Sequence, residues 1–113
     1  MPSWRPESVG RQIQEIISEI IHRRLKDPRL GFVTVTGVKV TRDLKTAKVY
    51  VSVMGDDESK DKSLETLSHA LPFVRKELGR RIRLRHTPEV LFEHDDSIQR
   101  GSRIDRLLED LKP

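Results

Sequence analysis

The chain has 113 residues, a net charge of +4 and no cysteine, and its hydrophobic and charged residues each make up 35% of the total. This length suits a single domain over residues 1–113 with an ordinary hydrophobic core, and the lack of cysteine excludes disulfides, thiol nucleophiles and thiolate metal sites. No apolar run is long enough to cross a membrane, and the N-terminus lacks the apolar stretch of a signal peptide. We therefore expect a cytoplasmic protein with no membrane partner and with residues 1–5 flexible.

The first predicted element is a helix from Pro6 to Lys26. Proline suits a first helical turn, and Asp27 precedes Pro28, which disfavours helix at Asp27 and predicts the helix end there. The apolar residues recur at helical spacing and form one stripe, made of Val9, Ile13, Ile16, Ile17, Ile20, Ile21 and Leu25. Because isoleucine is a weak helix former, packing of this stripe must hold the helix in place.

Two strands are predicted next, over residues 32–40 and 45–54. The second alternates cleanly, with Ala47, Val49, Val51 and Val53 on one face and Lys48, Tyr50 and Ser52 on the other. The polar connection from Thr41 to Leu44 is short enough for a hairpin. The alternation of the first strand shifts at Gly37, which predicts a β-bulge.

A helical pattern returns after an acidic loop from Gly55 to Asp61. Its apolar positions are Leu64, Leu67, Leu71, Val74, Leu78 and Ile82. Pro72 interrupts this pattern without changing its phase, and a proline removes a backbone hydrogen bond from a helix. We therefore predict two helices joined by a structural kink at Ala70, Leu71 and Pro72.

The chain is predicted to close with a third strand and a last helix. Pro88 precedes the strand, which runs through Val90, Leu91 and Phe92. The helix begins at about Ser102, and its apolar side consists of Ile104, Leu107, Leu108 and Leu111. This apolar side could cap the protein's own core or dock on a protein partner, so a protein adaptor is one alternative function.

Together the elements predict an α+β fold. Strands that alternate can be buried on one face only, so helices must cover one face of a three-stranded sheet. The order helix, strand, strand, helix, kink, helix, strand is that of the type II KH module, here followed by a C-terminal helix. None of the six glycines forms the Gly-x-x-G loop of that module. We expect a KH-like fold with an interrupted helix in place of the loop.

Charge is concentrated in one segment, Phe73 to His86. It nets +5, so the rest of the chain nets −1. Such a segment predicts a surface that binds a polyanion, and RNA phosphates are the expected ligand. The candidate RNA-binding residues are Arg75, Lys76, Arg80, Arg81, Arg83 and Arg85. Lys76, Arg80 and Arg83 are expected on the side of the helix opposite the core, and Arg85 just past its end. The alternative is a merely solvated helix face.

Three other residues are possible additional RNA contacts. Arg29 follows the first helix, in a segment that the pattern otherwise explains as a helix stop and a strand entry. Lys48 and Tyr50 lie on the open face of the sheet, where Tyr50 could stack on a base or serve cross-strand packing. With only five aromatic residues, we expect phosphate contacts and RNA shape to dominate recognition.

Catalysis is not expected. The four histidines are scattered and none has metal-ligand spacing, and a Gly-rich phosphate loop is absent from the sequence. The nearest cluster, His94, Asp95 and Asp96, fits a turn after the third strand. We predict no catalytic residue, metal, cofactor or small-molecule substrate.

Several short motifs are spread along the chain. They are Lys26-Asp27-Pro28-Arg29-Leu30-Gly31, Val40-Thr41-Arg42-Asp43-Leu44, Ala47-Lys48-Val49-Tyr50-Val51-Ser52, Arg75 with Leu78-Gly79, Arg83-Leu84-Arg85, Asp95-Asp96-Ser97, Gly101, Arg103-Ile104 and Leu107-Leu108. In their order and spacing, roughly from Glu7 to Leu108, these motifs resemble the bacterial ribosome-binding factor A family. The kink differs, because the family commonly has Ala-x-Gly where this chain has Ala70-Leu71-Pro72.

The resemblance implies a KH-like fold and a cytoplasmic assembly factor. Family members bind the small ribosomal subunit or its precursor, assist late maturation of 16S rRNA, and in many bacteria support growth after cold shock. We expect the same partner here and a monomer when free. A general KH-like RNA-binding module that is not tied to the ribosome is the alternative.

Overall fold

The computed structural model of the chain describes residues 5–95. Its elements are, in chain order, α1 (Pro6–Glu19), a short π-helix η1 (Ile20–Arg24), β1 (Val33–Val40), β2 (Thr46–Val53), α2 (Asp57–His69), α3 (Leu71–Arg81) and β3 (Glu89–His94). This is the predicted order, and the α+β class is confirmed. The predicted helix from Ser102 lies outside the described residues.

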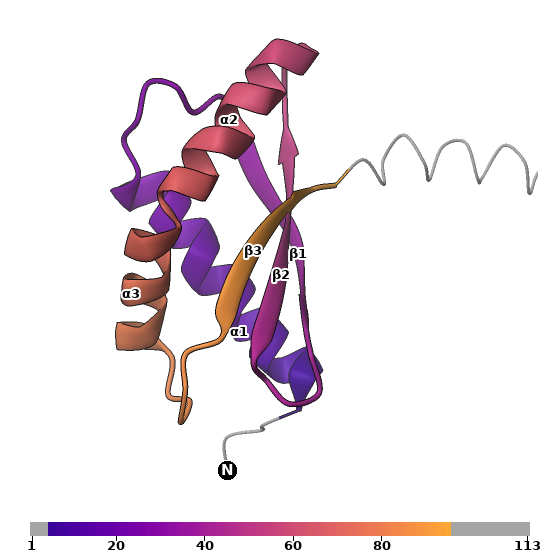
Figure 1. The fold of residues 1–113 in the computed structure, drawn as a ribbon, viewed down its shortest axis with the longest axis vertical. Helices are drawn as coiled ribbons and strands as arrows, with labels where there is room; N and C mark the ends of the chain where they lie inside the picture. The colour runs from indigo at the N-terminus through magenta and orange to yellow at the C-terminus, as the bar shows by residue number, and fades with distance from the viewer. Residues whose placement is uncertain (1–4, 96–113) are drawn as a thin grey trace, which may run out of the picture.

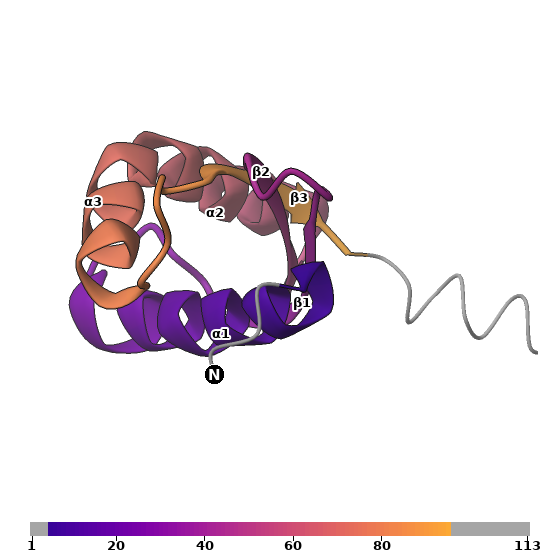
Figure 2. The same ribbon diagram turned by 90° about the horizontal axis from the view of Figure 1, so that it is seen from below.

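The three strands form one mixed sheet in the order β1-β2-β3 (Figure 1). β1 pairs with β2 antiparallel and β2 pairs with β3 parallel. The helices lie on one side of this sheet, which Figure 2 views along the strands. On β2 the residues facing the helices, Ala47, Val49 and Val51, are fully buried, whereas Lys48 and Tyr50 on the other face are partly exposed. The prediction of one covered face is correct.

The apolar stripe of α1 and η1 fills the space between helix and sheet. Val9, Ile13, Ile17, Ile20 and Ile21 are buried in the core. A Cβ built on Gly10 would lie 3.0 Å from the carbonyl oxygen of Val38, so a larger residue here would force α1 and β1 slightly apart. The last turn is a π-turn, in which the Leu25 N–H donates to the Ile20 carbonyl at 3.0 Å. The helical segment thus ends at Arg24, two residues before the predicted Lys26.

The predicted bulge is present in β1. Val35 pairs with Val51 and Gly37 with Tyr50, so Thr36 is the extra residue. Its hydroxyl donates to the carboxylate of Asp95 at 2.6 Å, a bond that ties the bulge to the end of β3.

The start of α2 differs from the prediction. Gly55 to Asp61 is not a loop, because α2 begins at Asp57 and the Asp56 carboxylate caps it by accepting from the Ser59 N–H at 2.8 Å. The first turns of α2 are wholly polar, so no apolar periodicity reveals them.

The kink between α2 and α3 lies where it was predicted. α2 ends at His69, Ala70 separates the helices with ψ of −3°, and Pro72 falls in the first turn of α3. A first-turn N–H has no partner within its own helix, so the missing N–H of Pro72 breaks no helical hydrogen bond.

At its other end α3 is shorter than predicted. It ends at Arg81, because Ile82 is extended with ψ of 134° although its side chain stays buried. β3 follows Pro88 as predicted. No helix within residues 5–95 is long and apolar enough to span a membrane.

Candidate nucleic-acid interface

The exposed side of α3 and the loop that follows it enclose a shallow groove of about 610 Å³, which we call the basic groove. It is lined by Pro72, Arg75, Lys76, Gly79, Arg80, His86 and Thr87. Three of the six predicted RNA-binding residues therefore line one surface, with the predicted kink at its end. Within the described residues, no acidic side chain lines this groove.

Two contacts set the width of the basic groove. Arg75 Nη2 donates to the Thr87 carbonyl at 3.3 Å, which ties the α3–β3 loop to the helix. A Cβ built on Gly79 would lie only 2.7 Å from Thr87 Oγ1, so the loop approaches the helix more closely than any other residue type would allow without a shift. The groove floor thus depends on a glycine in the last turn of α3, although glycine is a weak helix former.

One buried carboxylate organises the end of α3. Glu77 is 5% exposed and accepts ion pairs from Arg80 at 3.3 Å and from Arg81 at 3.6 Å. Arg81 also pairs with Glu19 of α1 at 3.5 Å. Both arginines lie in the last turn of α3, where positive charge favours the helix dipole. Arg81 therefore faces α1 and not the basic groove, so structural stabilisation explains its presence.

The other predicted basic residues are spread along the chain after the helix. Arg83 is exposed but lies beyond the end of α3. The prediction that it continues the helical row of Lys76 and Arg80 is therefore wrong. Arg85 lies past the helix end as predicted and lines a separate cavity beside the β1–β2 hairpin. Lys76, Arg83 and Arg85 form no ion pair within residues 5–95.

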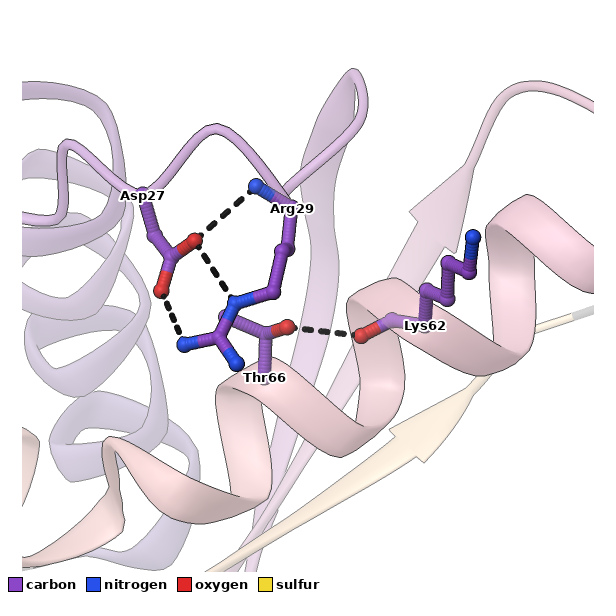
Figure 3. A network of polar contacts seen from close by, with 4 residues as sticks. All are labelled: Asp27, Arg29, Lys62 and Thr66. Carbon is purple, nitrogen blue, oxygen red and sulfur yellow. Dashed lines mark hydrogen bonds and ion pairs between the residues drawn. The ribbon is translucent and has the colours of Figure 1, made fainter.

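Arg29 is held by its own loop. Its backbone N–H and Nε donate to Asp27 Oδ1 at 2.9 and 3.1 Å, and its Nη2 donates to Oδ2 at 2.9 Å. These bonds hold the pKa of the Asp27 carboxyl below its usual range and raise the pKa of Arg29. Figure 3 shows the Arg29 side chain extending toward α2, where Thr66 bonds the Lys62 carbonyl.

This loop and the first turn of α3 share a second surface with basic residues. A cavity of about 560 Å³ is lined by Arg24, Leu25, Lys26, Asp27, Pro28, Arg29 and Phe73. Sequence reasoning missed Arg24, Lys26 and Phe73. The basic run at the end of the first helix was a usable signal, whereas the approach of Phe73 to it depends on the angle between α2 and α3.

Lys48 and Tyr50 lie elsewhere, on the open face of the sheet. Lys48 pairs with Glu93 of β3 at 3.6 Å, and Tyr50 is partly exposed between Gly37 and Glu93. The helices pack on the opposite face, so these two residues do not share a surface with the basic groove. Within residues 5–95, no group of three His, Asp or Glu side chains is placed to hold a metal ion.

Comparison with known proteins decides the family. The family model of ribosome-binding factor A matches residues 5–108. The chain belongs to the ribosome-binding factor A family. The resemblance found in the sequence motifs is thereby confirmed.

Solved structures of ribosome-binding factor A share its fold. The crystal structure from Thermus thermophilus is 30% identical with a TM-score of 0.71, and covers 80% of this chain and 97% of that one. The solution structure of a putative ribosome binding factor A from Thermotoga maritima is 34% identical with a TM-score of 0.74. The match covers 85% of this chain and 92% of that one. A homology model of the T. thermophilus factor, fitted into a cryo-EM map of a 30S complex of that factor, is 31% identical with a TM-score of 0.64, and covers 77% and 91%.

Proposed function

We propose that this chain is a non-catalytic assembly factor that binds the small ribosomal subunit or its precursor and assists late maturation of 16S rRNA. The observation that carries the proposal is the family match over residues 5–108. The fit of a relative into a map of its 30S complex supports the same partner here. We extend the proposal to a cytoplasmic monomer that contributes to growth in the cold.

The basic groove is the proposed RNA contact. Arg75, Lys76 and Arg80 present three positive charges on one side of α3, and cations that neutralise phosphates release condensed counterions. These side chains stand on a helix that the Glu77–Arg81–Glu19 ion pairs fix to α1. Because the groove is formed before RNA binds, little ordering cost opposes association.

No chemistry is needed for this role. A rigid domain bound to a structured RNA element biases which local RNA fold can form, in proportion to its differential affinity for the two folds. His22, the one histidine whose ring forms a hydrogen bond among the described residues, donates from Nε2 to the Val33 carbonyl at 3.0 Å and so stabilises the start of β1. We therefore expect no ATP or GTP turnover by the purified protein.

Sedimentation of cell lysates through sucrose gradients tests the proposal. The groove variant Lys76→Gln/Arg80→Gln removes two charges while Glu77 keeps Arg81 as its partner. The control variant Arg11→Gln/Lys60→Gln removes the same charge from α1 and α2, outside the groove. Wild type and control should co-migrate with free small subunits, and the groove variant should shift to the top fractions. Circular dichroism checks that all three are folded.

Two outcomes contradict the proposal in different ways. A wild-type protein that stays at the top of the gradient refutes the ribosomal partner. Equal losses in the groove and control variants refute the groove as the contact and leave a non-specific charge effect. Replacing the chromosomal copy with the groove variant should also raise the fraction of unprocessed 16S rRNA, measured by primer extension.

A further inference from the structure

A second cavity lies between the β1–β2 hairpin and the α3–β3 loop, next to the basic groove. It has a volume of about 290 Å³ and is lined by Asp43, Leu44, Lys45, Leu84, Arg85 and His86, and we call it the loop pocket. We propose that the loop pocket receives one unpaired nucleobase from an RNA strand whose phosphates lie in the basic groove. The inference rests on the proposed function and specifies the RNA that the site selects.

The loop pocket has apolar walls that suit a base and a basic rim that suits the neighbouring phosphates. Leu44 and Leu84 are partly buried, pack against the core and provide apolar surfaces of the kind on which a base face rests. Lys45 and Arg85 are exposed and have no ion-pair partner within residues 5–95, so they can hold the flanking phosphates. Apolar walls with a few polar groups at the rim are typical of small-ligand sites.

The pocket favours the base over the phosphate and a single base over a pair. Asp43 is part of the wall, and its negative charge repels a phosphate, whereas its carboxylate can accept a hydrogen bond from a base amino group. The volume of about 290 Å³ lies just below the range of about 300 to 1,000 Å³ found for small-ligand pockets, so the pocket has room for one base. A duplex, whose bases remain stacked and paired, cannot place one there without unpairing.

Hydrogen bonds fix the walls before any ligand binds. Asp43 Oδ1 accepts from Thr41 Oγ1 at 2.7 Å and from the Lys45 N–H at 3.0 Å. The Glu89 N–H donates to the Lys45 carbonyl at 2.8 Å, which joins the hairpin to the start of β3. Figure 1 shows the hairpin and the α3–β3 loop at the same, lower end of the molecule.

The backbone at Leu44 is strained, which is the second sign of a site. Its φ of +60° lies in the left-handed region, where a side chain with a Cβ is disfavoured. A glycine or asparagine would relieve the strain, yet the chain has a leucine that lines the cavity. Strained residues of this kind concentrate at binding sites.

The loop pocket adjoins the basic groove, which defines the path of the bound RNA from one to the other. His86 lines both the basic groove and the loop pocket. A strand that contacts Arg75, Lys76 and Arg80 through its phosphates reaches His86 at the groove's edge, and its next base meets the pocket. Recognition of splayed, unpaired bases is the common mode of sequence-specific RNA binding.

The test compares two RNAs and two matched variants of the full chain. The probes are a fluorescein-labelled single-stranded RNA ten-mer of mixed sequence and the same ten-mer annealed to its complement. Leu84→Phe fills the pocket, and Leu91→Phe makes the same change on the open sheet face, where Leu91 is 42% exposed. We expect Leu84→Phe to bind the single strand about tenfold more weakly, because base contacts of this kind contribute strongly to affinity. Its duplex affinity and both affinities of Leu91→Phe should match wild type.

Methyl NMR of the wild type provides a measurement that does not depend on a variant's folding. Signals of Leu44 and Leu84 should shift on saturation with the single strand and stay in place with the duplex. Unmoved methyl signals with bound single strand, or an equal loss of both RNAs in Leu84→Phe, overturn the pocket. If Leu84→Phe also co-sediments with small subunits like wild type, the proposed function survives that result, whereas a wild type that never co-sediments refutes the function itself.

Discussion

Arg81 of α3 forms an ion pair with Glu19 of α1, with 3.5 Å between Nη1 and Oε2. The same guanidinium pairs with Glu77, whose side chain is 7% exposed. Arg81→Gln therefore removes one partner of a buried carboxylate, and we expect the free energy of unfolding in urea to fall by about 1 to 3 kcal/mol. Arg80 also pairs with Glu77, at 3.3 Å, but its side chain is 69% exposed against 28% for Arg81, so water can replace it and Arg80→Gln should cost under about 1 kcal/mol.

RNA affinity should rank these two variants in the opposite order. Arg80 lines the basic groove and Arg81 faces α1, so Arg80→Gln should weaken binding to small subunits more than Arg81→Gln does. Filter binding on folded protein measures this. A stable Arg81→Gln that has lost binding would contradict the assignment of Arg81 to structure.

The salt dependence of the RNA association constant should report how many phosphates the basic groove neutralises. The log of the association constant falls with the log of salt concentration by about 0.7 to 0.9 per phosphate contact. Lys76→Gln/Arg80→Gln removes two groove charges and should lower the slope by about 1.4 to 1.8. The control Arg11→Gln/Lys60→Gln should leave the slope unchanged, and a control that lowers it equally would mean that the whole surface, not the groove, contacts RNA.

The parts of the fold that the sequence predicted are those with apolar periodicity. The stripe from Val9 to Leu25 and the alternation from Ala47 to Val53 each identify a buried face, so the element type follows. The bulge was visible because one extra residue reverses the alternation after Val35. Pro72 revealed the kink because a proline inside a continuous helix removes a backbone hydrogen bond, a loss that its place in the first turn of α3 avoids.

Apolar periodicity gave wrong helix ends in two places. It misses a helical turn that has no apolar residue, and it extends a helix over a buried residue whose backbone is extended. The first turn of α2 is wholly polar, and Ile82 stays buried although its backbone is extended. The site was predicted as a set of charges, yet the sequence does not specify which acid meets which base. Glu19 is more than sixty positions from Arg81, and residues 43–45 meet residues 84–86 only in the folded chain.

The effect of Gly79→Ala on the free energy of unfolding should change sign when Thr87 is also replaced. Gly79→Ala alone would place its Cβ 2.7 Å from Thr87 Oγ1 and should destabilise the protein by displacing the α3–β3 loop. Once Thr87→Ala has removed that hydroxyl, Gly79→Ala should instead stabilise the helix by about 1 kcal/mol relative to Thr87→Ala alone. Urea denaturation of the four proteins in this cycle measures the coupling. Equal effects of Gly79→Ala in both backgrounds would contradict a close contact.

Acid should weaken the cap of α2. The bond from the Ser59 N–H lowers the pKa of the Asp56 carboxyl from its ordinary value of 3.8, so folding favours the charged form. The stabilisation is therefore fully present above that value and is lost as the pH falls through the lower value of the folded state. Asp56→Ser keeps a capping oxygen but removes the titrating group. Between about pH 5 and pH 2 its Tm should fall less steeply than that of wild type.

The control for the cap is Asp61→Ser, which removes the same charge from the same helix without touching Asp56 or Ser59. Thermal unfolding followed by circular dichroism at a series of pH values compares the three proteins. A Tm that falls as steeply in Asp56→Ser as in wild type would show that the cap carries no charge-dependent stability. Because Asp27 and Asp43 also have lowered pKa values, Asp56→Ser should keep part of the acid sensitivity and lose only the share that its own carboxylate contributes.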